Sequence, residues 1–271
     1  MPELPEVETI KIGLKKKITN KKIVEIFRSN KNLRIESELD LNAIEGKKIK
    51  NIKRRARYLI IEIEKYSLII HLGMSGRLVF KTSLHNPEKH DHFICEFDDG
   101  SSLIFNDPRR FGFIDLIFTK NLSRHKFLTK LGFEPFDKIF DKKYLAQQLK
   151  NKTTNIKTTM MDNAIVVGVG NIYINESLFA AKISPLRKAN SLSTQEIAKL
   201  IVAIRYTLKN AIKSGGSSIN DYVDTAGNVG NFQNNFKVYG LNKKNCLECN
   251  SVIEKIVQNG RSSFYCKKCQ L

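Results

Sequence analysis

Cys246-Leu-Glu-Cys249 and, after sixteen intervening residues, Cys266-Lys-Lys-Cys269 decide the fold of the last part of the chain. Two Cys-x-x-Cys pairs at this separation match a tetrahedral zinc site, because each pair occupies a tight turn that points both sulfurs the same way. A module this small cannot build a sufficient core, so the bound metal must supply folding free energy. The sequence therefore predicts one structural Zn²⁺ with Cys246, Cys249, Cys266 and Cys269 as its ligands.

The segment between the two cysteine pairs is predicted to be a hairpin. Its sequence is Ile256-Val-Gln-Asn-Gly-Arg261-Ser-Ser-Phe-Tyr265, with Arg261 at or near the turn. A cation presented on a rigid turn suits contact with a phosphate or with the edge of a base. A purely structural role for the zinc module is the alternative interpretation.

Upstream of this module the hydrophobic pattern is first helical and then strand-like. Apolar residues recur at helical spacing within residues 2–19, and Pro5 and Glu6 suit the first turn of a helix. The stripe consists of Val7, Ile10, Leu14 and Ile18. Short strand-like runs follow, which predicts an antiparallel β-sandwich. The runs are 23–27, 48–53, 58–63, 68–72, 92–97, 102–106 and 113–118, with a hairpin turn at Asp98-Asp99-Gly100.

Helical spacing returns after about residue 123. The expected helices cover 124–131, 142–150, 156–163, 171–181 and 194–213. Ser193 and Glu196 are placed to form a capping box before the last of them. Residues 217–240 are polar and rich in Gly and Asn, which is typical of a mobile loop. The predicted class is α+β, with an N-terminal helix on an antiparallel β-sandwich in residues 1–120, a helical domain with this loop in 121–240, and the zinc module in 241–271.

The net charge of the chain is +19 and its isoelectric point is near 9.7, which is typical of a protein that binds a polyanion such as nucleic acid. Heavy use of Lys, Ile and Asn throughout the chain is an alternative source of this charge. No apolar run reaches the ~18–20 residues of a membrane span, and no secretory signal is present. We therefore expect a cytosolic protein without a membrane partner, in which paired cysteines favour a metal over a disulfide.

The first residues, Met1-Pro-Glu-Leu-Pro-Glu6, place a proline beside carboxylates. A small residue at position two favours removal of the initiator Met, which would give Pro2 a free secondary amine. An α-amine titrates at roughly 7.7–8.0, so part of it is neutral near pH 7 and can attack an electrophilic carbon to form an iminium. Glu3 and Glu6 would be acid–base partners of this amine. A plain helix start is the alternative, since Pro and Glu are both common there.

Six motifs occur in order along essentially the whole chain. They are Pro2-Glu-Leu-Pro-Glu-Val-Glu-Thr9, His71-Leu-Gly-Met-Ser-Gly76, Lys89-His-Asp-His92, Asp107-Pro-Arg-Arg-Phe-Gly112, Val167-Gly-Val-Gly-Asn-Ile-Tyr173 and the four-cysteine module. As an ordered set they closely resemble the formamidopyrimidine-DNA glycosylase family. Leu4 favours this family over endonuclease VIII, a relative for oxidised pyrimidines that typically has Gly there. The resemblance implies a helix-two-turns-helix motif in the helical domain and a zinc ribbon at the end.

The resemblance also implies a chemistry, the excision of oxidised purines from DNA. Pro2 would attack C1′ of the damaged nucleotide, and Glu3 would act as the general acid that assists opening of the sugar. The covalent iminium would then undergo β- and δ-elimination, which leaves a one-nucleotide gap. Arg261 matches the zinc-ribbon Arg that grips the phosphates and is linked to δ-elimination.

Further positions match the DNA contacts of the family. An enzyme that acts at C1′ must flip the nucleotide out of the duplex, so the vacancy needs filling. Met74, Arg109 and Phe111 match the residues that fill it, and they are a flexible apolar group, a fork-shaped donor and a flat aromatic wedge. By local pattern alone, Met74 and Phe111 could equally belong to the core. The remaining matches to DNA-contacting positions are His90, Lys152, Lys157 and Asn171.

Two positions depart from the pattern of the family. Arg57 stands where the family usually has a Lys that contacts the lesion and is considered a proton donor in β-elimination. A guanidinium holds a phosphate well but does not readily lose a proton. We therefore expect retained binding and base excision, with an altered lyase rate or lesion preference. At the second position, Leu241 replaces a basic residue that is often found in the family. Segment 217–240 corresponds to the loop that closes over the flipped base, and we assign no base-reading residue within it.

The expected partner is damaged double-stranded DNA, bound by a monomer in the bacterial cytoplasm. One alternative is a relative that prefers oxidised pyrimidines, which lesion choice in duplex DNA would reveal. Another is a non-catalytic, zinc-dependent paralogue that binds damaged DNA, in which retention of Met1 would block covalent chemistry. A zinc-ribbon RNA binder is not favoured, because the aromatic residues show no RNA-recognition-motif pattern.

Overall fold

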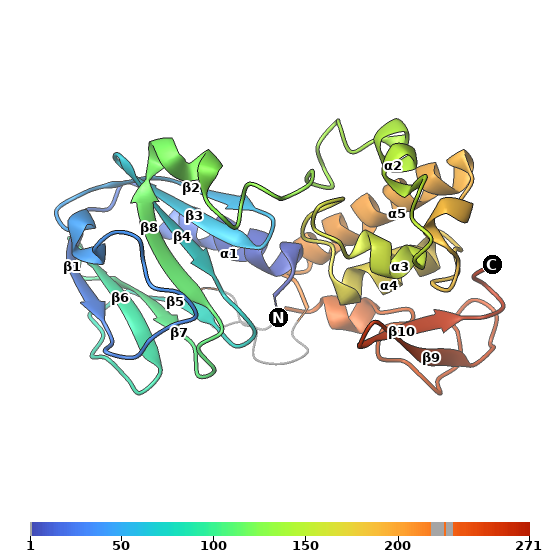
Figure 1. The fold of residues 1–271 in the computed structure, drawn as a ribbon. Coiled ribbons are helices and arrows are strands. Elements are labelled where there is room, and N and C mark those ends of the chain that lie inside the picture. Colours follow the sequence, from blue (N-terminus) through green and yellow to red (C-terminus); the bar gives the residue numbers. More distant parts are fainter. Residues whose placement is uncertain (1, 218–224, 226–229) are drawn as a thin grey trace. The chain divides into compact units, whose positions relative to one another are not determined.

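The chain forms two compact units in a computed structural model that describes residues 2–217, 225 and 230–271. The N-terminal unit comprises residues 1–129 and 214–231, and the C-terminal unit comprises residues 130–213 and 232–271. Figure 1 traces the chain through strands β1–β8 of the first unit and helices α2–α5 of the second. The expected domain boundaries near residues 120 and 240 stay predictions.

Helix α1 (Leu4–Ile18) opens the N-terminal unit. Pro5 lies in its first turn, and the Glu6 carboxylate accepts a hydrogen bond from the backbone N–H of Glu3 at 2.7 Å. Lysines occupy the last turn, where the helix dipole favours cations. Every residue of the predicted stripe is buried, with exposures of 0–1%, so the expected helix is confirmed.

Two four-stranded antiparallel sheets confirm the predicted α+β class and its β-sandwich. The first has the order β2-β3-β4-β8, with β2 (Ile49–Arg55), β3 (Tyr58–Ile63), β4 (Tyr66–His71) and β8 (Phe113–Phe118). The second has the order β1-β6-β7-β5, with β1 (Ile23–Arg28), β6 (Asp91–Phe97), β7 (Ser102–Asn106) and β5 (Arg77–Lys81). A 3₁₀ helix, η1 (Leu41–Ile44), lies between β1 and β2. Gly100, with a φ of +77°, lies in the turn of the expected β6–β7 hairpin.

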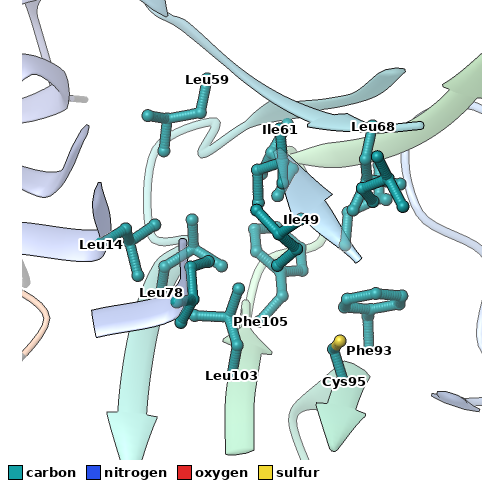
Figure 2. Close-up of a cluster of buried hydrophobic side chains, with 14 of the residues drawn as sticks. Leu14, Ile49, Leu59, Ile61, Leu68, Leu78, Phe93, Cys95, Leu103 and Phe105 are labelled. Atoms are coloured by element: carbon teal, nitrogen blue, oxygen red, sulfur yellow. The ribbon is translucent and has the colours of Figure 1, made fainter. Parts of the chain in front are cut away.

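One hydrophobic core joins α1 to both sheets (Figure 2). Leu14 of α1, Ile61 of β3 and Phe105 of β7 are among its fully buried side chains. A smaller cluster around Ile69 and Phe113 covers the other face of the first sheet. Because both of its faces are covered, β4 is buried along its whole length.

Two expectations for this unit are wrong. The segment 124–131 does not form the expected α-helix: Arg124 ends the 3₁₀ helix η2 (Thr119–Arg124), and residues 125–131 form turns and irregular backbone. Tertiary contacts set this path, because His125 Nε2 lies 3.0 Å from the buried Asp115 Oδ2 and Phe127 packs on Phe113 with 5.0 Å between ring centroids. Strand β5 was not predicted. Among the described strands it pairs with β7 alone, at the edge of its sheet, so it needs little of the apolar alternation that identifies a strand.

The C-terminal unit contains the other expected helices. They are α2 (Lys142–Leu149), α3 (Ile156–Met160), α4 (Asn171–Ala180) and α5 (Thr194–Lys213), with 3₁₀ turns η3 (Ala189–Ser191) and η4 (Phe232–Asn235). The predicted capping box precedes α5, since the Glu196 N–H bonds Ser193 Oγ at 3.3 Å and the Ser193 N–H bonds Glu196 Oε2 at 2.8 Å. Strands β9 (Ile253–Gln258) and β10 (Arg261–Cys266) pair antiparallel and form the expected hairpin.

Part of the segment 217–240 that was expected to be a mobile loop lies outside the described residues, which omit 218–224 and 226–229, while η4 (Phe232–Asn235) lies in its described part. Among helices within the described ranges, none combines the length and apolarity that crossing a bilayer requires.

We expect Ile10→Ala to lower the free energy of unfolding by about 2–5 kcal/mol, because Ile10 is fully buried and its truncation opens a cavity under α1. Ile12→Ala is the matched control, since it removes the same side chain from the same helix at a position that is 42% exposed. Its effect should stay within about 0.5 kcal/mol. Urea denaturation followed by circular dichroism measures both, and equal losses would contradict the assigned burial.

Candidate functional site

Pro2 and Glu3 lie at the very start of α1, and both are buried. The nearby Glu6 carboxylate is 2% exposed and accepts two backbone N–H groups, from Glu3 at 2.7 Å and from Ser217 at 2.8 Å. A carboxylate bound in this way anchors the backbone at the beginning of the chain. Glu6 is therefore a structural acceptor, and the role of Glu3 as the general acid beside Pro2 stays a prediction.

Arg57 is half-buried in the tight turn between β2 and β3. The preceding Ala56 has a φ of +53°, in the left-handed region. Arg54 ties this turn to α1, because its Nε donates to Glu8 Oε2 at 2.7 Å and its Nη1 donates to the Ala56 carbonyl at 3.0 Å. Burial acts to raise the pKa of Glu8, but hydrogen bonds from two cations lower it below its ordinary value. The turn that carries Arg57 is thus braced on α1.

Three rings stack across the adjoining ends of β3, β4 and β8. His71 is paired with Tyr58 on one side and with Phe113 on the other, at centroid distances of 5.0 Å and 5.6 Å. Burial, together with two nearby arginines, lowers the pKa of His71 to about 4, so the ring is neutral at pH 7. Its Nδ1 accepts the N–H of Gly73 at 3.1 Å. The ring stack therefore fixes the start of the loop after β4.

Met74, Arg109 and Phe111 project from two loops that touch each other. Met74 is 46% exposed and Phe111 is 45% exposed, so neither belongs to the core. The Arg109 guanidinium lies over the Phe111 ring, 4.9 Å from its centroid. The loops meet at Gly73, which has a φ of +61° and where an added Cβ would lie 2.4 Å from the Gly112 nitrogen. The three predicted void-filling residues are thus gathered on the surface of the N-terminal unit.

Asn171 is the first residue of α4, directly after the glycine-containing loop 167–170. Gly168 in this loop has a φ of +74°. The Asn171 Oδ1 atom is buried and has no hydrogen-bond partner among the described residues. The first N–H groups of a helix carry partial positive charge and bind anions such as phosphate. The predicted phosphate contact of Asn171 suits this position and stays a prediction.

The three basic residues predicted in the C-terminal unit have different surroundings. Lys152 is exposed in the turn after α2. Lys157 is only 1% exposed, and its Nζ donates to the Ser262 carbonyl at 2.9 Å. Arg261 is exposed at the start of β10, after the Asn259-Gly260 turn, in which both residues have a positive φ as in a type I′ hairpin. Lys157 therefore supports the strand that carries Arg261, and its own DNA contact stays a prediction.

The four predicted zinc ligands come together in the C-terminal unit. Their Sγ atoms all lie within 4.8 Å of one another, with 3.3 Å between Cys249 and Cys266 and 3.9 Å between Cys246 and Cys269. A tetrahedron with Zn–S bonds of about 2.3 Å has edges of about 3.8 Å, so the cluster fits one Zn²⁺. Four protein ligands leave no open coordination position, which is the arrangement of a structural site.

Two buried residues of α4 hold the zinc module in place through hydrogen bonds, and neither was predicted from the sequence. Asn175 Oδ1 accepts the N–H of Phe264 in β10 at 2.7 Å. The Glu176 carboxylate accepts the backbone N–H groups of residues 237–239 at 2.8–3.0 Å. Burial raises the pKa of Glu176, although these N–H groups oppose the shift. The signal that could have identified them is that Asn175 and Glu176 are polar residues within a mostly apolar helical segment.

In the N-terminal unit, sequence reasoning missed Ser75 and Asp107. Both are buried, and the Ser75 hydroxyl donates to Asp107 Oδ1 at 2.6 Å. The backbone N–H of Asp107 also donates to the carbonyl of His90, a half-buried residue that was predicted to contact DNA. Both residues stand in motifs that were recognised, but their burial could not be inferred from local pattern.

Three family models match consecutive parts of the chain. They are the formamidopyrimidine-DNA glycosylase N-terminal domain over residues 1–114, the formamidopyrimidine-DNA glycosylase H2TH domain over 131–223, and a zinc finger found in FPG and IleRS over 243–271. Among curated proteins, formamidopyrimidine-DNA glycosylases of Wolbachia pipientis from Culex pipiens and of Ruthia magnifica are each 48% identical to the chain. In both cases the alignment covers all of each protein.

Solved structures from Lactococcus lactis are similar over 99% of both chains. A mutant of its FPG protein in complex with DNA containing Fapy-dG matches with a TM-score of 0.90 and 37% identity. The same protein in complex with DNA containing an abasic site matches with a TM-score of 0.89 and 37% identity. The wild-type protein in complex with DNA containing an oxidised pyrimidine has a TM-score of 0.89 and 36% identity.

We expect the purified chain to hold one zinc ion and Cys266→Ala to lose it, because three thiolates bind zinc far more weakly and the module folds only with its metal. The control is Cys95→Ala, which removes a buried thiol from the sandwich core and should leave the zinc content unchanged. Inductively coupled plasma mass spectrometry gives the metal per chain. A full zinc content in Cys266→Ala would contradict the assigned ligand set.

Proposed function

The chain belongs to the formamidopyrimidine-DNA glycosylase family, and on that basis we propose that it removes oxidised purines, 8-oxoguanine and formamidopyrimidines, from duplex DNA and then cuts the strand at the resulting abasic site. The observation that carries this proposal is the 48% identity over the whole chain. A consistent detail is that Pro2 and Glu3 directly precede the body of α1, on a backbone held by Glu6.

Pro2 is the nucleophile in this proposal. Once Met1 is removed, the neutral secondary amine attacks C1′ of the damaged nucleotide, and the bond from C1′ to the base breaks. Glu3 gives a proton to the sugar ring oxygen as the ring opens, and the electron pair of the Pro2 nitrogen completes an iminium with C1′. The leaving base takes up the proton that the Pro2 nitrogen loses, and the covalent intermediate carries the positive charge of the iminium.

Strand cleavage follows from the acidity that the iminium gives to C2′. Loss of a C2′ proton breaks the C3′–O bond in β-elimination, and a second elimination breaks the C5′–O bond. Arg57 and Arg261 stabilise the phosphates during these steps by charge and by hydrogen bonds. Because a guanidinium does not readily lose a proton, Arg57 contributes electrostatics and not proton transfer.

The other predicted residues bind the duplex. Met74, Arg109 and Phe111 fill the space left by the flipped nucleotide, and Arg109 contacts the orphaned base. Asn171 and the positive end of α4 take a phosphate, because the dipole of a helix favours an anion at its N-terminus. His90, Lys152 and Lys157 complete the set of contacts. The zinc ion, when bound, keeps the β9–β10 hairpin rigid so that Arg261 is presented in one geometry.

Oxidised pyrimidines are a second substrate class, favoured by the structural likeness to the Lactococcus lactis protein in complex with such a lesion. A non-catalytic, zinc-dependent paralogue that binds damaged DNA is the alternative to the whole proposal. We place the activity in the bacterial cytoplasm and assign it to a monomer, since one chain carries all the required parts.

We expect borohydride to trap a covalent complex between the chain and a duplex containing 8-oxoguanine opposite cytosine, because reduction fixes the Pro2 iminium. Pro2→Gly should reduce the trapped fraction at least about tenfold, whereas the control Pro5→Gly, on the same helix, should retain most of it. Mass spectrometry of the intact protein verifies that Met1 is absent. If such protein yields no trapped species and yet binds the duplex, the non-catalytic alternative holds.

We expect Arg57→Lys to raise the rate of β-elimination by about tenfold, because a lysine amine can transfer a proton that a guanidinium keeps. The rate of base release should change far less, since both cations hold a phosphate. Single-turnover assays that separate base release from strand cleavage give the two rates. Arg28→Lys, on the exposed end of β1, controls for the exchange itself. Unchanged kinetics of every step in Arg57→Lys would refute this role.

A further inference from the structure

The carboxylate of Asp107 joins two loops that carry exposed candidate DNA contacts. Asp107 has an exposure of 0%. Its Oδ1 accepts the Ser75 hydroxyl at 2.6 Å, and its Oδ2 accepts the N–H of Gly112 at 2.8 Å. Ser75 directly follows Met74, and Gly112 directly follows Phe111. One buried side chain thus bonds the loop of Met74 to the loop of Phe111.

Arg109 is held by the same group of atoms. Its backbone N–H lies 3.2 Å from Ser75 Oγ and 3.3 Å from Asp107 Oδ1, so the two oxygens share it. Ser75 Oγ therefore donates to the carboxylate and accepts from the Arg109 backbone at the same time. The position of the Arg109 backbone depends on both residues, while its guanidinium remains free to stack on Phe111.

The backbone of Asp107 extends this arrangement to a third loop. Its N–H donates to the His90 carbonyl at 3.0 Å, and its carbonyl lies 3.0 Å from His92 Nε2. The carbonyl also accepts the N–H of Arg110, a residue whose φ of +56° places it in the left-handed region. A non-glycine residue adopts this conformation only where its surroundings enforce it.

A buried carboxylate is costly unless its oxygens are hydrogen-bonded. Among the described residues, the donors to the Asp107 carboxylate come from the two touching loops. Any displacement of one loop against the other would leave the carboxylate short of donors, so the group has one low-energy arrangement. The two loops also touch closely at Gly73, where an added Cβ would lie 2.4 Å from the Gly112 nitrogen.

We propose that Ser75 and Asp107 are positioning residues that hold Met74, Arg109 and Phe111 in a fixed mutual geometry before DNA binds, and so set how well the enzyme everts a lesion and reads the opposite base. This inference rests on the proposed function, because it assigns those three side chains to the void in the duplex. Preorganisation of this kind lowers the cost of ordering the loops at the moment of binding.

The test is Ser75→Ala, which removes the bond between the loops and leaves the carboxylate in place. Asp107→Asn would be less informative, since it puts an amide against the Gly112 N–H and endangers the fold. Ser67→Ala is the matched control: Ser67 is a buried serine of β4 whose hydroxyl lies 3.0 Å from Thr119 Oγ1, away from both loops. Both variants remove a buried serine hydroxyl that forms hydrogen bonds: with Asp107 and the Arg109 N–H for Ser75, and with Thr119 for Ser67.

Single-turnover excision of 8-oxoguanine is measured opposite cytosine and opposite adenine, and borohydride trapping is measured on single-stranded DNA with a preformed abasic site. We expect Ser75→Ala to excise about 5- to 10-fold more slowly opposite cytosine, which corresponds to about 1–1.4 kcal/mol for the loss of the hydrogen bonds of this hydroxyl. The preference for cytosine over adenine should shrink as well. Trapping on the single strand, which has no void to fill, should match the wild type.

Ser67→Ala should keep the excision rate of the wild type and its preference for cytosine over adenine, even if it unfolds at a lower urea concentration. Equal rates and equal preference in Ser75→Ala and the wild type would overturn the positioning role, as would an equal loss in both variants. A wild-type chain that neither excises the lesion nor forms a trapped complex would instead overturn the proposed function.

Discussion

Burial of one apolar stripe of α1 is the interaction on which the N-terminal unit depends. This stripe packs against the inner faces of both sheets in a single core, and the packing fixes the position of the N-terminal residues. Chain ends are otherwise the most mobile parts of a domain. The polar side of the same helix adds two further ties, through Glu6 to Ser217 and through Glu8 to Arg54. Core packing thus determines the location of Pro2 and, through Arg54, of the turn at Arg57.

Buried side-chain acceptors that bind backbone N–H groups recur throughout both units. Glu6, Asp107 and Glu176 each use a carboxylate in this way, and Asn175 uses its amide oxygen. An ionised carboxylate has two oxygens and no donor, so it can order several loop N–H groups at once. The residues that it orders keep their own side chains available for a ligand. This division explains how loops without regular structure present exposed cations and apolar groups reproducibly.

Periodicity and short apolar runs predicted most of the fold, because burial follows one face of helices such as α1 and covers all of strands such as β4. Helix α1, seven of the eight sandwich strands and the zinc hairpin were all visible in this way. The failures have tertiary causes: an edge strand needs no strong alternation, and residues 124–131 follow the contacts of His125 and Phe127. For the site, ordered motifs indicated the exposed residues. They did not indicate Ser75, Asn175 or Glu176, because no local pattern distinguishes a buried acceptor from a solvated one.

Side chains of α3 and α4 hold the zinc hairpin through hydrogen bonds to its main chain and to the segment that precedes it. Lys157 binds a carbonyl of β10, Asn175 binds an amide of the same strand, and Glu176 binds amides of the segment that leads into the module. Main-chain groups are the same in every sequence, so these bonds place no demand on the exposed side chains of the hairpin. Ile253 and Phe264, in contrast, share a buried cluster with Phe179 of α4 and must stay apolar. Mutations can therefore accumulate at the exposed positions of the hairpin without redesign of the helices beneath it.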